Sequence, residues 1–266
     1  IRPYRSIGSN ISLQYFDNKK IFNCYGHGGK GWSILYGSVC EILDLIYKNN
    51  ISRHENITVL GAGCVGLTIA AYLKINNYKV NLVAQDYYNI ASYKAGANFT
   101  IGLTRARDFT RAQLNYNFLR SIYEGNHQII KPEAISKIKS YAHSSVIESH
   151  LKLIDDFSEE VIIDTGVKLH GDYKSYYNYF IDVNIFLKNL KDYLLTNNVV
   201  LHQQKITSFN EIDSEVIINC TGIGSRELLE DSSLRPAVTY MIAFQDSPLD
   251  YILKTSKDDH FYIYPK

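Results

Sequence analysis

Two glycine-rich turns stand close together in the chain, and each could hold a ligand. The first, YGHGGKGWS, runs over 25–33, and the second, VLGAGCVGL, runs over 59–67. Each is followed by apolar residues at helical spacing. Backbone N–H groups at a helix N-terminus, together with the helix dipole, attract phosphate or other negative charge. Both turns are therefore candidate sites for an anionic or carbonyl-bearing ligand.

The second turn has the spacing of a dinucleotide-binding turn. Gly61, Gly63 and Gly66 form a GxGxxG pattern after a predicted strand and before a predicted helix. In such turns the three glycines permit a tight turn, a close approach to pyrophosphate, and close helix–strand packing, respectively. An acidic residue about 20 positions on would hold a ribose hydroxyl, and Gln85 and Asp86 meet that position approximately. The alternative is a tight turn in a fold that binds no nucleotide.

The first turn and a later strand add candidate residues around the same ligand. A helix N-terminus after the first turn would suit the N1 and C2 carbonyl region of a flavin, where negative charge gathers on reduction. His27 in this turn is expected to be structural rather than catalytic. EVIINCTG, over 215–222, would bring Thr221 and Gly222 to the carboxyl edge of a sheet, where doubly wound folds bind ligands.

The elements that position these residues follow from apolar spacing. Strands are predicted over 57–61, 79–86, 199–209, 215–222, 237–244 and 260–265, a hairpin over 11–25, and helices over 33–47, 65–74, 112–122 and 183–195. One helix with a break is predicted over 132–155, and a Tyr-rich strand near the end of 171–181. The unit from 57 to 86 has the size of one βαβ crossover.

Composition narrows the functional classes. The chain has 266 residues, 45% of them hydrophobic, and a net charge of +1, which argues against a dedicated nucleic-acid or membrane-surface protein. No apolar run is long enough to span a membrane, and no signal peptide is recognisable. The four cysteines have no metal-ligand spacing and are expected to be buried thiols, so we expect a cytoplasmic protein without a bound metal. A homodimer is compatible with this composition.

Five segments, taken together, resemble the D-amino-acid oxidase family, within the wider group of FAD-dependent amino-acid and amine oxidases. They are VLGAGCVGLTIAAYL for the FAD turn, VIINCTG with LLEDSSLRPAVTYMI for a later FAD segment, NCYGHGGKGWSILYG for the flavin turn, IRPYR for the Arg-Pro element, and FYIYP for a substrate-binding strand. The resemblance implies an α/β fold, with a Rossmann-like FAD-binding domain and a smaller α+β substrate domain. The FAD-binding domain is expected over 16–130 and 196–235. The substrate domain, expected to be truncated, covers 1–15, 131–195 and 236–266.

The order of these segments differs from that of the family. There the FAD turn comes first, and the Arg-Pro and flavin-turn segments come last. Here the last segments come first, so the chain looks circularly permuted. The helix over 33–47 would then run through a short linker into the strand over 57–61. A linker of about eight residues reaches up to about 25 Å, enough to join neighbouring elements.

The resemblance also implies roles for particular residues. Arg2 would hold a substrate carboxylate in a bidentate fork, and Tyr262 would donate its hydroxyl to the same group. Both would position the substrate for hydride transfer from its Cα to the flavin, with O₂ as acceptor. The implied FAD-binding residues are Gly26, His27, Gly28, Gly29, Lys30, Gly31, Trp32, Gly61, Ala62, Gly63, Cys64, Val65, Gly66, Gln85, Asp86, Thr221 and Gly222.

Departures from the family pattern keep other functions open. Asp258 stands where a second tyrosine is expected, and PAVTY replaces the family's Pro-x-Arg-Gly-Gln element at 236–240. One alternative is a flavoprotein dehydrogenase that passes electrons to an acceptor other than O₂. Another is a non-catalytic or altered FAD-binding protein derived from such an oxidase. The substrate side chain is not predicted.

Overall fold

The computed structural model describes most of the chain. The described residues are 2–100, 106–146, 157–158, 173–238, 242, 250–255 and 262–264. The predicted strand over 237–244 lies almost entirely outside them. The structural statements below concern the described residues.

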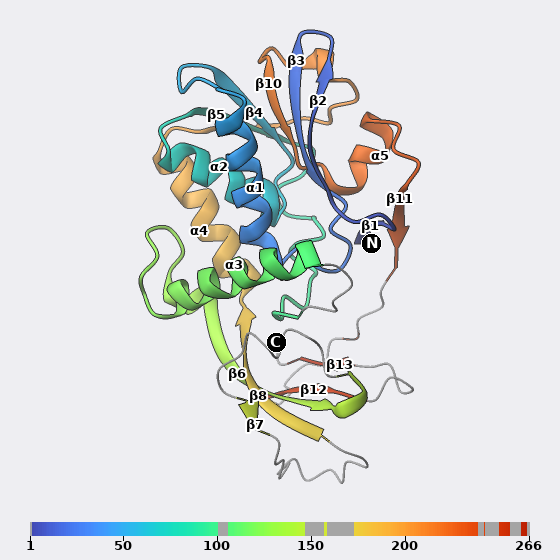
Figure 1. The fold of residues 1–266 in the computed structure, drawn as a ribbon. Helices are drawn as coiled ribbons and strands as arrows, with labels where there is room; N and C mark the ends of the chain where they lie inside the picture. Colours follow the sequence, from blue (N-terminus) through green and yellow to red (C-terminus); the bar gives the residue numbers. More distant parts are fainter. Residues whose placement is uncertain are drawn as a thin grey trace.

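A six-stranded sheet forms the larger part of the molecule (Figure 1). Its order is β2 (Asn10–Phe16), β3 (Lys19–Tyr25), β10 (Val216–Asn219), β4 (Asn56–Leu60), β5 (Lys79–Ala84) and β9 (Val200–Gln203). All neighbours are parallel except β2 and β3, which form the predicted hairpin. The α/β prediction is therefore confirmed, and the carboxyl ends of the parallel strands share one edge.

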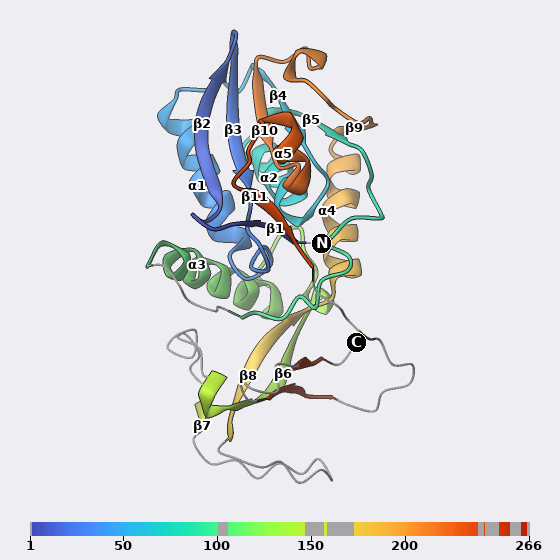
Figure 2. The ribbon, with the colours of Figure 1, turned by 90° about the vertical axis from the view of Figure 1, so that its right-hand side faces the viewer.

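Three helices lie side by side on one face of this sheet (Figure 2). They are α1 (Leu35–Lys48), α2 (Cys64–Ile75) and α4 (Val183–Thr196), as predicted over 33–47, 65–74 and 183–195. Alternate strand residues point to the two faces. Ile57 and Val59 pack under the helices in the main core, whereas Leu60 packs with Phe209 and Ile212 on the other face. The parallel strands thus read as continuous apolar runs because both of their faces are buried.

A third layer joins this body to a smaller sheet. The helix α3 (Ala106–Tyr123), predicted over 112–122, packs across α1 and also contacts the small sheet (Figure 1). The five-stranded small sheet has the order β13 (Tyr262–Ile263), β12 (Ile252–Lys254), β6 (Ile135–His143), β8 (Tyr173–Ile181) and β7 (Phe157–Ser158). The predicted strand near the end of 171–181 is confirmed by β8.

The helix predicted over 132–155 is wrong for its described residues. This stretch begins with a short 3₁₀ turn, η1 (Pro132–Ala134), and continues as the strand β6, followed by η2 (Ser144–Val146). Residues 147–155 lie outside the described part. The strand β6 is central, paired with β8 on one side and β12 on the other. Its end is buried on both faces, at Ser140, Tyr141 and Ala142, so no alternation marks it as a strand.

The domain boundaries drawn from the sequence stay a prediction. The structure places all of β2 in the six-stranded sheet and packs α4 against α2. A third, two-stranded sheet pairs β1 (Arg2–Arg5) with β11 (Leu234–Ala237). The four cysteines are free thiols, and Cys24, Cys64 and Cys220 are buried. None of the described helices is long and apolar enough to cross a membrane.

One half-buried histidine makes stability depend on pH. Burial lowers the pKa of His127 to about 4. Its Nδ1 accepts hydrogen bonds from the N–H groups of Ile129 and Ile130, and its Nε2 lies 3.1 Å from the Tyr72 hydroxyl. An unfolded histidine titrates near pH 6.5, so the unfolded chain binds more protons between about pH 4 and about 6.5. The contribution of His127 to stability is therefore lost as pH falls through this range.

We expect the free energy of unfolding in urea to fall between pH 7 and pH 5, and to fall less in a His127→Asn variant. Asparagine keeps an acceptor for the backbone N–H groups but does not titrate. His54 is exposed, so His54→Asn should leave the pH slope as it is in the parent chain. Equal slopes in His127→Asn and the parent chain would contradict the assignment.

Candidate active site

The second glycine turn has the tight geometry that its sequence predicts. Gly61 ends β4 with a φ of +102°, a region that favours glycine, and its N–H donates to the Val83 carbonyl at 2.8 Å. A Cβ at position 61 would lie 2.5 Å from the carbonyl oxygen of Cys220, and one at position 66 would overlap the carbonyl oxygen of Gly61. Both glycines are therefore required for the close packing of β4, α2 and the end of β10.

The two glycine turns meet at Ser92, a residue that the sequence did not single out. The Ser92 hydroxyl accepts from the N–H of Cys64 at 3.0 Å, at the start of α2. The Ser92 carbonyl accepts from Trp32 Nε1, in the first turn, at 3.4 Å. A Cβ at Gly63 would lie 3.3 Å from the Ser92 hydroxyl. Ser92 thus connects both turns, whose sequence positions lie about 30 residues apart.

The acidic residue at the end of β5 is committed to its own turn. Asp86 Oδ1 accepts from the N–H groups of Tyr88 at 2.8 Å and Asn89 at 3.0 Å. These two hydrogen bonds lower the pKa of the Asp86 carboxyl below its usual value. The neighbouring Gln85 is exposed, and its carbonyl accepts from Gln203 Nε2 at 3.3 Å. Asp86 is thus an ionised carboxylate next to the edge at which β4 ends.

A buried amide organises the end of β10. Asn219 Oδ1 accepts from the Thr221 hydroxyl at 2.8 Å and its N–H at 3.2 Å, and Asn219 Nδ2 donates to Asn23 Oδ1 at 3.0 Å. Gly222 has a φ of +59°, and the nearest neighbour to a Cβ there would be Pro3 Cγ at 3.8 Å. The hydrogen bonds of Asn219 therefore fix the turn at Thr221 and Gly222. The side of Gly222 on which a Cβ would lie has space.

The glycines of the first turn make room for the strand β1. Gly26 and Gly28 have φ values of +79° and +64°. A Cβ at Gly26 would lie 2.6 Å from Arg5 Cδ, one at Gly28 would lie 3.3 Å from the Tyr4 ring, and one at Gly29 would lie 2.6 Å from Arg2 Nη1. The Gly28 N–H also donates to the Pro3 carbonyl at 2.8 Å. The structure thus brings Arg2 directly onto the first glycine turn.

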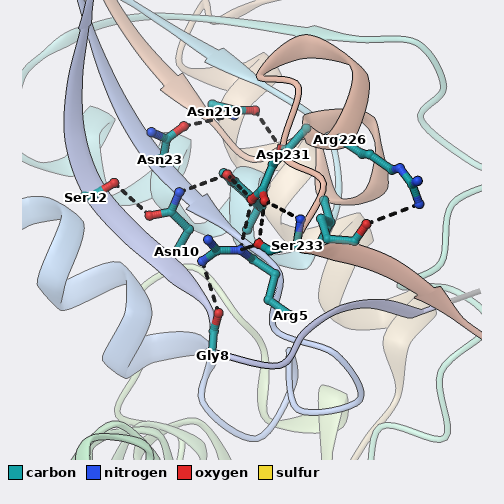
Figure 3. A network of polar contacts seen from close by, with 12 residues as sticks. Arg5, Gly8, Asn10, Ser12, Asn23, Asn219, Arg226, Asp231 and Ser233 are labelled. Carbon is teal, nitrogen blue, oxygen red and sulfur yellow. Dashed lines mark hydrogen bonds and ion pairs between the residues drawn. The ribbon is translucent and has the colours of Figure 1, made fainter.

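An ion pair fastens β1 in this place. Figure 3 shows Arg5 pointing at Asp231, with Arg5 Nε 2.9 Å from Asp231 Oδ2. The Tyr25 hydroxyl donates to the same carboxylate at 2.8 Å and accepts from Asn10 Nδ2 at 2.9 Å. Burial raises the pKa of Tyr25 to about 12, and the adjacent Asp231 carboxylate adds to the shift. Arg5 and Asp231 therefore link β1, the first turn and the segment before β11.

The polar side chains of the first turn are engaged within the protein. Ser38 donates its hydroxyl proton to the Ile34 carbonyl, so His27 Nε2, 3.1 Å away, donates to the Ser38 oxygen. Lys30 Nζ lies 3.2 Å from Asp108 Oδ2 on α3. These contacts hold the turn in shape.

An arginine on α3 joins α3 to α1, the helix that follows the first turn. Arg111 is 3% exposed and forms a two-pronged ion pair with Glu41 on α1, at 2.6 and 2.8 Å. A Cβ at Gly37 would overlap the Arg111 backbone, so this glycine allows α3 to cross α1 closely. Arg111 also donates to the Ser9 hydroxyl at 2.8 Å. It therefore anchors the α1–α3 crossing and the loop after β1.

The second predicted substrate residue lies on the small sheet. Tyr262 is in β13 and is 46% exposed, with its ring centroid 6.4 Å from that of Tyr264. The Tyr264 ring lies 3.5 Å from where a Cβ of Gly96 would be. Arg2 and Tyr262 thus come from two different sheets, whereas Arg2 and both glycine turns lie on one body.

The residues present fit a dinucleotide such as FAD. The N-cap residue of α2, Gly63, has no capping side chain, and Ser92 bonds the N–H of Cys64 beside it. A Cβ at Gly222 would have its nearest neighbour at 3.8 Å, so the turn there also has space beside it. Such a helix start after a parallel strand is the usual place for a pyrophosphate. The predicted residues Ala62 and Val65 are buried in the core, so they can act only through their backbone.

Comparisons with known proteins find D-amino-acid oxidases among the similar sequences. The chain is 25% identical over 233 residues to a D-amino-acid oxidase of Dictyostelium discoideum, covering 79% of this chain and 63% of that protein. It is 32% identical over 66 residues to a D-amino-acid oxidase of Streptomyces coelicolor (strain ATCC BAA-471 / A3(2) / M145), covering 25% of this chain and 21% of that protein. The chain thus spans less than two thirds of the length of these relatives. No family model matches the chain.

Similar solved structures include a glycine oxidase from Bacillus cereus ATCC 14579, with a TM-score of 0.47 and 14% identity, covering 80% of this chain and 68% of that one. Another is an iminodiacetate oxidase from Chelativorans sp. BNC1, with a TM-score of 0.47 and 13% identity. That match covers 65% of this chain and 57% of the oxidase chain. In sequence, the chain is therefore similar to D-amino-acid oxidases over most of its length.

Proposed function

We propose that the chain is an FAD-dependent oxidoreductase that oxidises a D-amino acid, glycine or a related amine to the imino acid, with O₂ as the electron acceptor. One observation carries this proposal: both glycine turns meet at Ser92, and Arg2 lies on the first of them. A dinucleotide turn, a second ligand turn and a carboxylate-binding side chain are then adjacent. The unpaired thiols favour a cytoplasmic location.

The proposed FAD site uses the backbone more than the side chains. N–H groups at the start of α2 would hold the pyrophosphate, and Asp86 would accept from a ribose hydroxyl. The backbone of Gly28–Gly31 and of Thr221–Gly222 would face the rest of the group. When bound, FAD supplies the redox chemistry, since it takes up the hydride of the substrate and passes electrons to O₂.

The residues of the chain then have to bind and orient the substrate. The guanidinium of Arg2 presents a planar fork that matches a carboxylate, and Tyr262 can donate one further hydrogen bond. Neither residue has to move a proton, so the proposal requires positioning only.

We also propose that the segment order is permuted relative to the family. In support, α1 leads through residues 49–55 into β4, and β3 and β4 both flank β10.

The test is the visible spectrum of the purified protein, with FAD added if the protein is colourless. Anaerobic addition of a mixture of D-amino acids and glycine should bleach the oxidised-flavin bands, and admission of air should restore them with release of peroxide. Bleaching that only an artificial acceptor reverses would replace O₂ by another acceptor. Flavin that binds but is not reduced by any amino acid or amine would contradict the proposed oxidation.

A further inference from the structure

Two buried cysteines stand side by side at the ends of neighbouring strands. Cys24 is in β3, and Cys220 directly follows β10. The residues before them, Asn23 and Asn219, are direct partners in the parallel pairing of these strands, and Asn219 Nδ2 donates to Asn23 Oδ1 at 3.0 Å. Parallel neighbours lie about 4.8 Å apart, which is within the Cα separation of about 4.4 to 6.8 Å that a disulfide spans. The backbone therefore places Cys24 and Cys220 within bonding range of each other.

The two thiols share a face of the sheet and contact each other. Because Asn23 and Asn219 point to one face, the next residue of each strand points to the other. Cys24 and Cys220 both belong to the main core beneath the helices. The Cys220 thiol donates a hydrogen bond to the sulfur of Cys24. The side chains therefore bring the two sulfur atoms together, as the backbone does the two Cα atoms.

The surroundings of the two thiols differ in a way that separates their roles. Burial acts to raise the pKa of Cys24, but hydrogen bonds from Cys220 and His27 outweigh it, and the Arg111 cation adds to them, so this pKa is lowered. His27 Nε2 lies 4.0 Å from Cys24 Sγ. Burial and the neighbouring Cys24 raise the pKa of Cys220. Cys24 is therefore the thiol that ionises, whereas Cys220 keeps its proton.

We propose that Cys24 and Cys220 form a reversible dithiol site that reacts with hydrogen peroxide. The Cys24 thiolate attacks one oxygen of the peroxide, the O–O bond breaks, and the leaving hydroxide takes up a proton to become water. The Cys220 sulfur then attacks the sulfenic acid on Cys24. The S–S bond forms, the S–O bond breaks, and the hydroxyl leaves with the Cys220 proton as a second water. The two thiols lose two electrons, which reduce one peroxide to two waters.

The position of the pair suits a reaction that can be reversed. Hydrogen peroxide is close to water in size, and Cys220, at 9% exposed, lies at the end of its strand. Parallel neighbours hold their Cβ atoms about 4.8 Å apart, whereas a disulfide prefers about 3.8 Å, so the bond is strained and easily reduced. The inference goes beyond the proposed function, which would release peroxide in the same protein, and it requires only added peroxide.

The experiment treats the purified, fully reduced chain with hydrogen peroxide, blocks the remaining thiols at set times, and maps the peptides without a reductant. A peptide pair joined through Cys24 and Cys220 should appear, and both thiols should disappear at least about 10-fold faster than the thiol of Cys40. Cys40 on α1 is less buried than either, but burial raises its pKa. Millimolar glutathione should then restore both thiols, because a strained disulfide is readily reduced.

Two variants separate the roles of the pair. Cys220→Ala removes the thiol that resolves the sulfenic acid, so the sulfenic acid on Cys24 should persist and be trapped by dimedone. Cys40→Ala is the matched control and should form the disulfide at the rate of the parent chain. Circular dichroism checks that both variants are folded. If Cys220→Ala does not fold, the peptide map and the thiol rates of the parent chain decide the question alone.

The outcomes distinguish this inference from the proposed function. The inference is overturned if Cys24 and Cys220 stay free while Cys40 is oxidised, or if Cys24 pairs with Cys64 instead. A disulfide that glutathione leaves intact also overturns it, because the pair would then be structural. If the disulfide forms in a chain whose flavin no amino acid or amine reduces, the dithiol site stands and the proposed oxidation fails. Amino-acid oxidation in a chain that forms no disulfide has the opposite meaning.

Discussion

An Arg2→Ala variant is expected to keep its flavin and to lose about 1,000-fold in kcat/KM towards D-amino acids. Arg2 is the side chain that the structure places on Gly29 of the first glycine turn. Removing it leaves the carboxylate of the substrate without its planar, two-pronged donor. Because the interaction orients the substrate as well as binding it, we expect both KM and kcat to change.

The measurement is steady-state kinetics at equal flavin content, with the thermal midpoint as a check of folding. Arg2→Lys should recover only part of the activity, since an ammonium supplies charge without the fork. Arg235 offers a matched control, because it is exposed on β11, the strand that pairs with β1. Arg235→Ala should have the activity of the parent chain. An Arg2→Ala variant with unchanged kcat/KM would remove Arg2 from the substrate site.

The second large effect is expected at Gly66. A methyl group at this position would overlap the carbonyl oxygen of Gly61, which is backbone and cannot rotate away. The helix α2 would have to move off β4, and its N-terminal N–H groups would leave the place proposed for the pyrophosphate. We expect Gly66→Ala to destabilise the fold by about 3 kcal/mol. The purified variant should retain little or no flavin.

Gly224→Ala is the control for this variant. A Cβ at Gly224 would lie 3.4 Å from Thr221 Cβ, which is ordinary van der Waals contact. Urea unfolding and the ratio of flavin to protein absorbance should therefore match the parent chain. If Gly66→Ala bound flavin as tightly as Gly224→Ala does, the turn after β4 would not be the dinucleotide site.

The sequence predicts the body that holds the glycine turns far better than it predicts the small sheet. The runs around 57–61 and 79–86 are continuous and apolar, and a GxGxxG turn lies between them, so strand, turn and helix support one another. The segment over 135–143 has no such support. It is a strand because β8 and β12 pair with it, and both are more than 30 residues away. Pairing at that distance leaves no periodic pattern in the strand itself.

The candidate site also divides into residues predicted from local sequence and residues placed by distant contacts. The sequence predicts that Gly61 permits a tight turn and Gly66 close helix–strand packing, and the structure gives each a backbone neighbour that requires a glycine. Ser92 carries no motif, and the motif that contains Asp231 predicts no role for it, so both positions depend on which segments meet in three dimensions. For the first turn, the sequence predicts backbone N–H groups at a helix N-terminus that suit a ligand. The structure adds that Gly26, Gly28 and Gly29 also admit side chains of β1.

The position of β10 between β3 and β4 has a consequence for how the chain is made. When residue 210 has left the ribosome, both neighbours of β10 have been synthesised, but the strand that joins them has not. The hairpin of β2 and β3 and the pair of β4 and β5 then expose two apolar strand edges of the kind that promote aggregation. The order of synthesis therefore delays completion of the sheet until β10 emerges. Nascent chains of this protein are expected to need protection by chaperones over that interval.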